Sequence, residues 1–165
     1  MIRPETASPD EPAPDAANAD VVVIGVGNAY RSDDAVGPLV IRALQKNLTG
    51  GARLLEHSGE GAGLMEAWRG ARRVVLVDAI TSGAPPGTIH RIDCSRAPLP
   101  RDLAVSSSHA FGVAEGVAAA RVLGQLPPEV VLFGIEAGSF EYGVVPTPAV
   151  AASIPLLVRK ISDEF

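Results

Sequence analysis

The chain has 165 residues, 47% of them apolar and 20% charged, which is the balance of a globular protein with one domain and a real core. Its net charge of −5 argues against a nucleic-acid-binding protein, because phosphate binding needs clustered Lys and Arg. No apolar run reaches the ~20 residues that span a bilayer, and the acidic first residues do not resemble an export signal. Cys94 is the only cysteine, which excludes an internal disulfide and a cysteine-based metal cage. These features favour a cytoplasmic protein without nucleic-acid or membrane partners.

The first residues differ in composition from the rest of the chain. Residues 1–19 carry four prolines among Ala, Asp and Glu, and such a segment buries too little apolar surface to offset the entropy of ordering. We therefore expect a disordered tail over 1–19 and one folded domain over 20–165. Residues 21–25 form a β-branched run that is typical of a strand buried on both faces. A helix is predicted over 33–48, with Ser32 or Asp33 as its cap.

The remaining chain alternates short apolar runs with helical patterns. Predicted strands cover 52–56, 73–78, 88–93 and 130–135, and predicted helices cover 61–68, 109–123 and 147–161. Such alternation predicts a three-layer α/β/α sandwich with a mixed, mostly parallel sheet. The turn over 82–87 is too short for a crossover helix, so we expect the strand after it to be an antiparallel edge strand, and residues 99–107 to be loop.

Side chains that can bind a metal follow these strands. Asp33 and Asp34 come after a glycine turn, Asp78 ends an apolar run, and His109 begins a predicted helix. Open α/β folds place their ligands at the carboxyl ends of the strands, and a carboxylate that leaves a dry core needs a cation or hydrogen-bond donors. Carboxylates and a neutral imidazole suit nickel, zinc or manganese, and three protein ligands leave positions open for a substrate.

The same residues also have structural interpretations. Asp33 and Asp34 can be acids of a first helical turn, and His109 can be a cap or a packing residue. Glu136, after the last strand, can line the same cleft or serve the structure. The glycine turn and Glu56 invite a dinucleotide site, but Tyr30 stands where the third glycine of that fingerprint is needed.

Four segments in this order and spacing resemble a known family, the nickel-iron hydrogenase maturation endopeptidases. They are residues 25–28 with 33–37, residues 77–79, residues 107–112, and residues 134–136 with 147–150. The resemblance runs over 20–161. It implies a mixed five-stranded sheet of the phosphorylase/hydrolase-like kind, with one antiparallel edge strand.

The resemblance also implies an activity. Members remove a C-terminal extension from the precursor of a hydrogenase large subunit after nickel insertion, with nickel as the recognition element. Carried over, Asp34, Asp78 and His109 are the catalytic and nickel-contacting residues of a metal-assisted, aspartic-type endopeptidase. The nickel is carried by the precursor, and we expect a monomer. A nucleotide-binding α/β module and a non-catalytic assembly factor are the alternatives.

Overall fold

The computed structural model describes residues 20–48, 50–100, 103–105 and 112–165. The predicted disordered tail over 1–19 and the candidate ligand His109 lie outside this part of the chain. The strands are β1 (Val21–Val26), β2 (Arg53–His57), β3 (Arg73–Thr81), β4 (Ile89–Asp93), β5 (Ala104–Val105) and β6 (Glu129–Glu136). The helices are η1 (Ser32–Ala35, a 3₁₀ turn), α1 (Val36–Asn47), α2 (Gly61–Ala67), α3 (Val113–Val122) and α4 (Pro148–Ser162).

The strands form one mixed sheet in the order β2-β1-β3-β6-β4. The first four of these are parallel to one another, and β4 runs antiparallel to β6 at the edge, as the sequence predicts. The two-residue strand β5 pairs antiparallel with the end of β3, inside the segment predicted as loop. Its shortness leaves no periodic pattern that could have predicted it.

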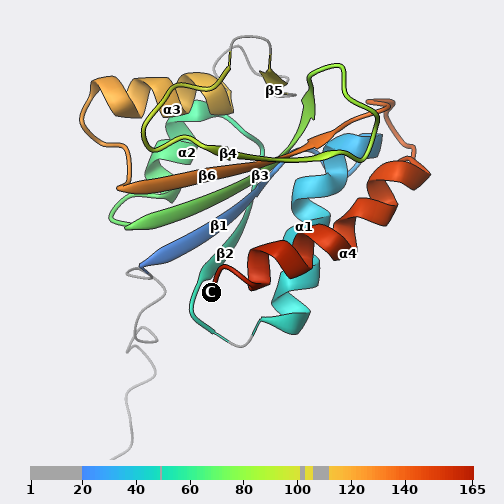
Figure 1. Cartoon of the computed structure of the whole chain (residues 1–165), viewed down its shortest axis with the longest axis horizontal. Helices are drawn as coiled ribbons and strands as arrows, with labels where there is room; N and C mark the ends of the chain where they lie inside the picture. Colours follow the sequence, from blue (N-terminus) through green and yellow to red (C-terminus); the bar gives the residue numbers. More distant parts are fainter. Residues whose placement is uncertain (1–19, 49, 101–102, 106–111) are drawn as a thin grey trace, which may run out of the picture.

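Helices cover both faces of the sheet, because the central strands are apolar on both sides. Figure 1 shows α2 and α3 on one face and α1 and α4 on the other. Side chains alternate along each strand, so that Ile24, Leu76 and Leu132 pack under α2 and α3. Their neighbours Val23, Val75 and Phe133 pack under α1 and α4. The predicted three-layer sandwich is thereby confirmed.

Two helix starts differ from the prediction. The helix predicted from residue 33 opens as the 3₁₀ turn η1, and neither Ser32 nor Asp33 caps α1 with its side chain. The helix predicted from His109 begins instead at Val113, because Gly112 is extended and its N–H donates to the carboxylate of Glu115 at 3.0 Å. No helix in the described ranges is both long and apolar enough to cross a bilayer.

Candidate active site

Glycines bring the end of β1 into direct contact with the start of α1. A Cβ atom on Gly25 would overlap the carbonyl oxygen of Gly37, and one on Gly37 would overlap the backbone of Val26. Gly27 has a φ of +136°, and a Cβ there would overlap the carbonyl oxygen of Asp34. Only glycine combines this backbone conformation with such close contact. The turn therefore fixes Asp34 beside the carboxyl end of β1.

This packing explains the glycines without a nucleotide. Carbonyl groups of the protein itself fill the space beside Gly25 and Gly27, and the N–H of Gly27, which a phosphate would need, donates to the carbonyl of His57 at 3.0 Å. Glu56, which would hold a ribose, instead binds Arg42 through two hydrogen bonds of 2.8 and 3.0 Å. The geometry therefore argues against the dinucleotide interpretation.

Asp34 is almost completely buried, although it lies in the short 3₁₀ turn η1. Only 4% of its surface is exposed, and its Oδ2 accepts a hydrogen bond of 3.0 Å from the backbone N–H of Asn28. The side chain of Asn28 in turn accepts from the N–H of Tyr30. The short turn between β1 and η1 thus folds around this carboxylate.

Asp78 lies within β3, which continues for three residues beyond the predicted end, to Thr81. Leu76 belongs to the core under α2 and α3, so the alternation along the strand turns Asp78 toward the same face. Its side chain is fully buried, and neither carboxyl oxygen has a hydrogen-bond partner among the described residues. Burial raises the pKa of Asp78 well above its usual range, and the nearby carboxylate of Asp34 raises it further.

The structure therefore brings together two of the three predicted ligands. Two buried carboxyl groups that interact cannot both stay ionised without a counter-charge, so they either keep a proton or bind a cation. The described residues contain no cluster of three or more His, Cys, Asp or Glu that could hold a metal ion. Since His109 is not among them, the three-residue nickel site stays a prediction.

Asp33 has a different role from its neighbour Asp34. Its buried carboxylate accepts hydrogen bonds from the N–H groups of Gly138, Ser139 and Thr147, at 2.7, 3.0 and 2.7 Å. The hydroxyl of Thr147 donates to it as well. Asp33 therefore fastens the loop between β6 and α4 to the turn that carries Asp34. Nothing in the local sequence predicts these partners, which are more than a hundred residues away.

Glu136 is also structural. It ends β6, where its carboxylate accepts from the N–H groups of Ser82 and Gly83 and from the hydroxyl of Ser82, at 2.8 to 3.1 Å. Burial alone would raise the pKa of Glu136, but these donors lower it below its usual value. Glu136 thereby holds the connection from β3 to β4 where it passes over the end of β6.

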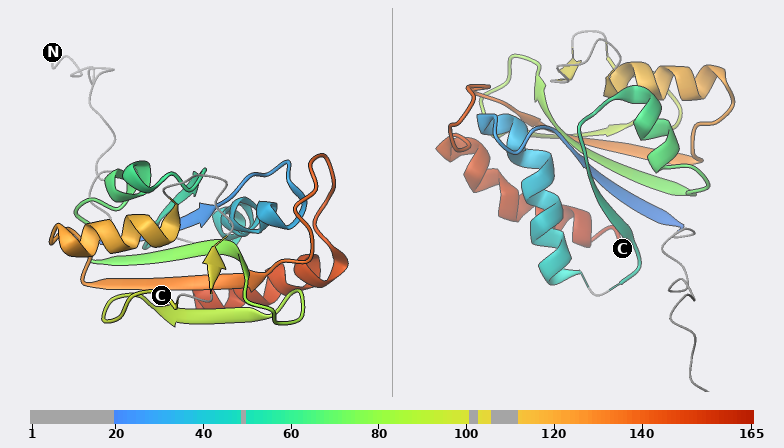
Figure 2. Two further views of the ribbon diagram at one scale, coloured as in Figure 1. Left: turned by 90° about the horizontal axis from the view of Figure 1, so that it is seen from above. Right: turned by 180° about the vertical axis from the view of Figure 1, so that it is seen from behind.

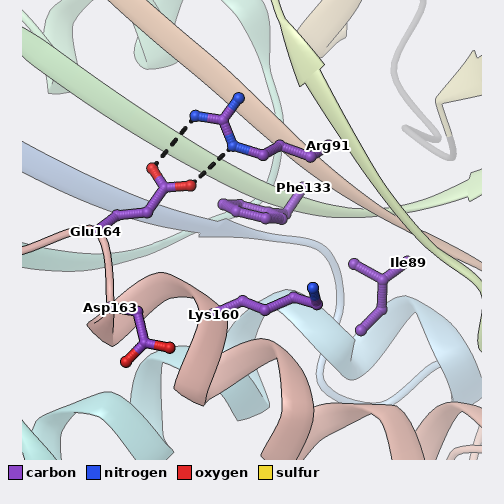
Figure 3. A pocket seen from close by; sticks show the side chains of 6 residues that line it. All are labelled: Ile89, Arg91, Phe133, Lys160, Asp163 and Glu164. Carbon is purple, nitrogen blue, oxygen red and sulfur yellow. Dashed lines mark hydrogen bonds and ion pairs between the residues drawn. The ribbon is translucent and has the colours of Figure 1, made fainter.

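Two other candidate features fall outside the site. Cys94 is buried, and burial raises the pKa of its thiol to about 11, so it is no thiolate nucleophile at neutral pH. A pocket of about 260 Å³ lies between β4 and the end of α4, where Arg91 binds Glu164 over the ring of Phe133 (Figure 3). Phe133 packs under α1 and α4, so this pocket opens on the opposite face of the sheet from Asp78.

Comparison with known proteins identifies the fold and the family. A family model described as hydrogenase maturation protease matches residues 38–164. The chain belongs to the hydrogenase maturation protease family. It is 30% identical to HupD of Thiocapsa roseopersicina over a match that covers 73% of this chain but only 55% of HupD. It is also 30% identical to HoxM of Cupriavidus necator, over 87% of this chain and 72% of HoxM.

A solved structure shows the same architecture. The hydrogenase-maturating endopeptidase HybD of Escherichia coli superposes with a TM-score of 0.72 and is 26% identical, over 86% of this chain and 88% of HybD. This agreement confirms the predicted α/β fold. The family is one of proteases, so the chain belongs among hydrolases that act on peptide bonds.

Proposed function

We propose that this protein is an endopeptidase that removes a C-terminal extension from the precursor of a nickel-iron hydrogenase large subunit, after nickel has been inserted. The observation that carries the proposal is the pair of buried carboxyl groups that interact with each other, Asp34 in η1 and Asp78 in β3. Membership of the hydrogenase maturation protease family supports this precursor as the substrate. We further propose that the protein acts as a monomer in the cytoplasm.

The nickel ion enters this proposal as a part of the substrate. Asp34, Asp78 and His109 would contact nickel that the precursor already holds. The unpartnered oxygens of Asp78 suit such a contact, because a cation would compensate for their burial. Carboxylate and imidazole are ligands that nickel accepts. Nickel would then serve as the recognition element that places the scissile bond near the carboxyl pair.

Protonation of Asp78 connects recognition with chemistry. Burial and the carboxylate of Asp34 raise the pKa of Asp78 and so favour its protonated form in the free enzyme. Binding of the nickel held by the precursor would displace such a proton, since metal ligands must be deprotonated. One of the two carboxylates could then accept a proton from an attacking water molecule.

The proposal is tested with purified precursor in nickel-loaded and nickel-free forms. We expect the wild-type protein to shorten only the loaded form, as read by intact-mass measurement of the large subunit. Asp78→Asn and His109→Ala should abolish cleavage. Asp93→Asn is the matched control, because Asp93 is an exposed residue of β4.

Three outcomes would contradict the proposal. Cleavage by Asp78→Asn at the wild-type rate would remove the carboxyl pair from the mechanism. Equal cleavage of both precursor forms would remove nickel as the recognition element. An unchanged C-terminus, although the protein binds the precursor, would favour the alternative of a non-catalytic assembly factor.

A further inference from the structure

An exposed apolar surface lies on the segment that leads to Asp34 and on the loop that Asp33 fastens to this segment. It consists of Tyr30, Tyr142, Val144 and Val145, and we call it the Tyr30–Val145 surface. These side chains are 79%, 68%, 46% and 78% exposed. Within the described residues, half of the large apolar side chains that are exposed belong to it. Exposed apolar residues that gather in this way, with tyrosines among them, mark sites of protein–protein contact.

Two loops far apart in sequence build the Tyr30–Val145 surface. They are the loop after β1 and the loop between β6 and α4, which lie side by side in both views of Figure 2. The N–H of Gly143 donates to the carbonyl of Tyr30 at 2.8 Å. Ser32 donates through its N–H to Val144 and through its hydroxyl to Val145, at 3.0 and 3.2 Å.

These contacts hold the surface in one shape before any partner arrives. Ser32 adopts a φ of +44°, which is unfavourable for a residue with a side chain and persists only where its surroundings enforce it. The guanidinium of Arg31 lies 5.3 Å from the ring centres of both Phe140 and Tyr142, and its Nε donates to the carbonyl of Phe140. A preformed surface loses less entropy on binding than a flexible one.

The Tyr30–Val145 surface is mechanically linked to the candidate active site. Residues 28–34 form one short segment that runs from the turn after β1 into η1, with Tyr30 in the turn and Asp34 in η1. Asp33 ties this turn to the second loop through Gly138, Ser139 and Thr147. Hydrogen bonds therefore join the turn that carries Asp34 to both of the loops that form the Tyr30–Val145 surface.

We propose that the Tyr30–Val145 surface docks the folded body of the hydrogenase large-subunit precursor, while the segment to be cut reaches Asp34 and Asp78. This inference rests on the proposed function, which supplies the partner. Continuity of the two loops with the carboxyl pair argues for the precursor rather than for another occupant. The partner patch should be apolar at its centre, because the exposed residues here are Tyr and Val.

The test introduces a negative charge in two separate variants. Val145→Glu places the charge within the Tyr30–Val145 surface. Val122→Glu places it outside this surface, because Val122 lies at the end of α3, where it is 87% exposed. With nickel-loaded precursor, we expect Val145→Glu to raise KM by about tenfold or more and to change kcat by less than about twofold. Val122→Glu should keep both wild-type values. Tyr30→Ser serves as a second variant, with the same expected rise in KM.

Direct binding separates this inference from the proposed function. Calorimetric titration with nickel-free precursor should show a weaker Kd for Val145→Glu than for wild type. If the wild type binds but never cleaves, and Val145→Glu still weakens binding, the proposed function fails and the docking surface stands. Wild-type KM and Kd in both surface variants would overturn the inference. The inference would also be overturned if the wild type eluted as a dimer in size-exclusion chromatography and Val145→Glu eluted as a monomer. The surface would then bind a second copy of the chain.

Discussion

The buried carboxyl group of Asp78 lowers the stability of the fold, although the proposed active site needs it. Its carboxyl group is buried without a hydrogen-bond partner in the described part of the chain, which costs stability. Because burial and Asp34 raise its pKa, the native state keeps a proton that the unfolded chain loses near the ordinary pKa of 3.8. The free energy of unfolding should therefore fall as the pH rises above this value, up to the raised native pKa.

Replacing Asp78 by Asn should remove this dependence. The amide cannot ionise, so its burial costs the same at every pH. We expect the stability of Asp78→Asn relative to wild type to improve by about 1–3 kcal/mol between about pH 4 and pH 8. Urea unfolding at the two pH values measures the change. A difference between the two proteins that is independent of pH would show that Asp78 is ionised in the native protein.

Sequence reasoning located Asp34 and Asp78 because Asp34 follows, and Asp78 ends, a predicted strand that is itself easy to recognise. The residues alone could not separate Asp34 from Asp33, since the two acids are adjacent and equally suited to a first helical turn, and the choice of Asp34 comes from the family resemblance. The fold distinguishes them physically, because Asp33 turns toward Gly138 and Thr147 whereas Asp34 lies near Asp78. Long-range partners of this kind leave no local pattern.

At the scale of elements, the unit from β1 through η1 to α1 depends on contact between backbones. Gly27 is the most constrained position, because it combines a positive φ with contact to Asp34. Gly70 also has a positive φ, of +77°, but nothing lies within 4 Å of a Cβ added there. Substitution of Gly70 therefore costs stability only through the backbone conformation, whereas substitution of Gly27 also displaces Asp34.

Alanine substitutions at Gly27 and Gly70 should have different effects. Gly70→Ala should lose about 1 kcal/mol of stability and cleave precursor normally. Gly27→Ala should in addition move the turn that holds Asp34 and lower the cleavage rate by about a hundredfold or more, because small displacements of reacting groups are that costly. Thermal unfolding and precursor cleavage measure the two effects. Equal cleavage by both variants would show that the position of Asp34 is not critical.

Element types were easier to predict than their limits and partners. The five long strands, with β4 as the antiparallel edge strand, follow from apolar runs and a short turn. The pairing of β4 with β6 does not, because β6 comes later in the chain and enters between β3 and β4. The start of α3 was misplaced because Gly112 interrupts a segment that is otherwise apolar and helical in pattern.

At the scale of the whole molecule, one sheet separates two cores. Trp68, the only tryptophan, follows α2 and is buried with Leu64 of α2 in the core between the sheet and the helices α2 and α3. Leu157 of α4 is buried in the core on the opposite face. The strands β1, β3 and β6 contribute side chains to both cores, so neither core can form completely while the sheet is unfolded. This arrangement favours one cooperative unfolding transition.

Leu157→Ala tests this cooperativity from the far side of the sheet. Truncation of a buried leucine should lower the free energy of unfolding by about 2–5 kcal/mol. The fluorescence of Trp68 should report the full loss, at the same urea midpoint as circular dichroism. If the fluorescence midpoint stayed at the wild-type value while the dichroism midpoint fell, the two layers would unfold separately.

The hydrogen bonds of Asp33 have a consequence for the newly made chain. Its partners Gly138, Ser139 and Thr147 leave the ribosome more than a hundred residues later, together with the strand that completes the middle of the sheet. Translation proceeds from the amino end, so the turn that positions Asp34 cannot be fastened before the segment over 138–147 has left the ribosome. A protease truncated before this segment should therefore be unable to cleave the precursor, and activity should begin only after the segment has been made.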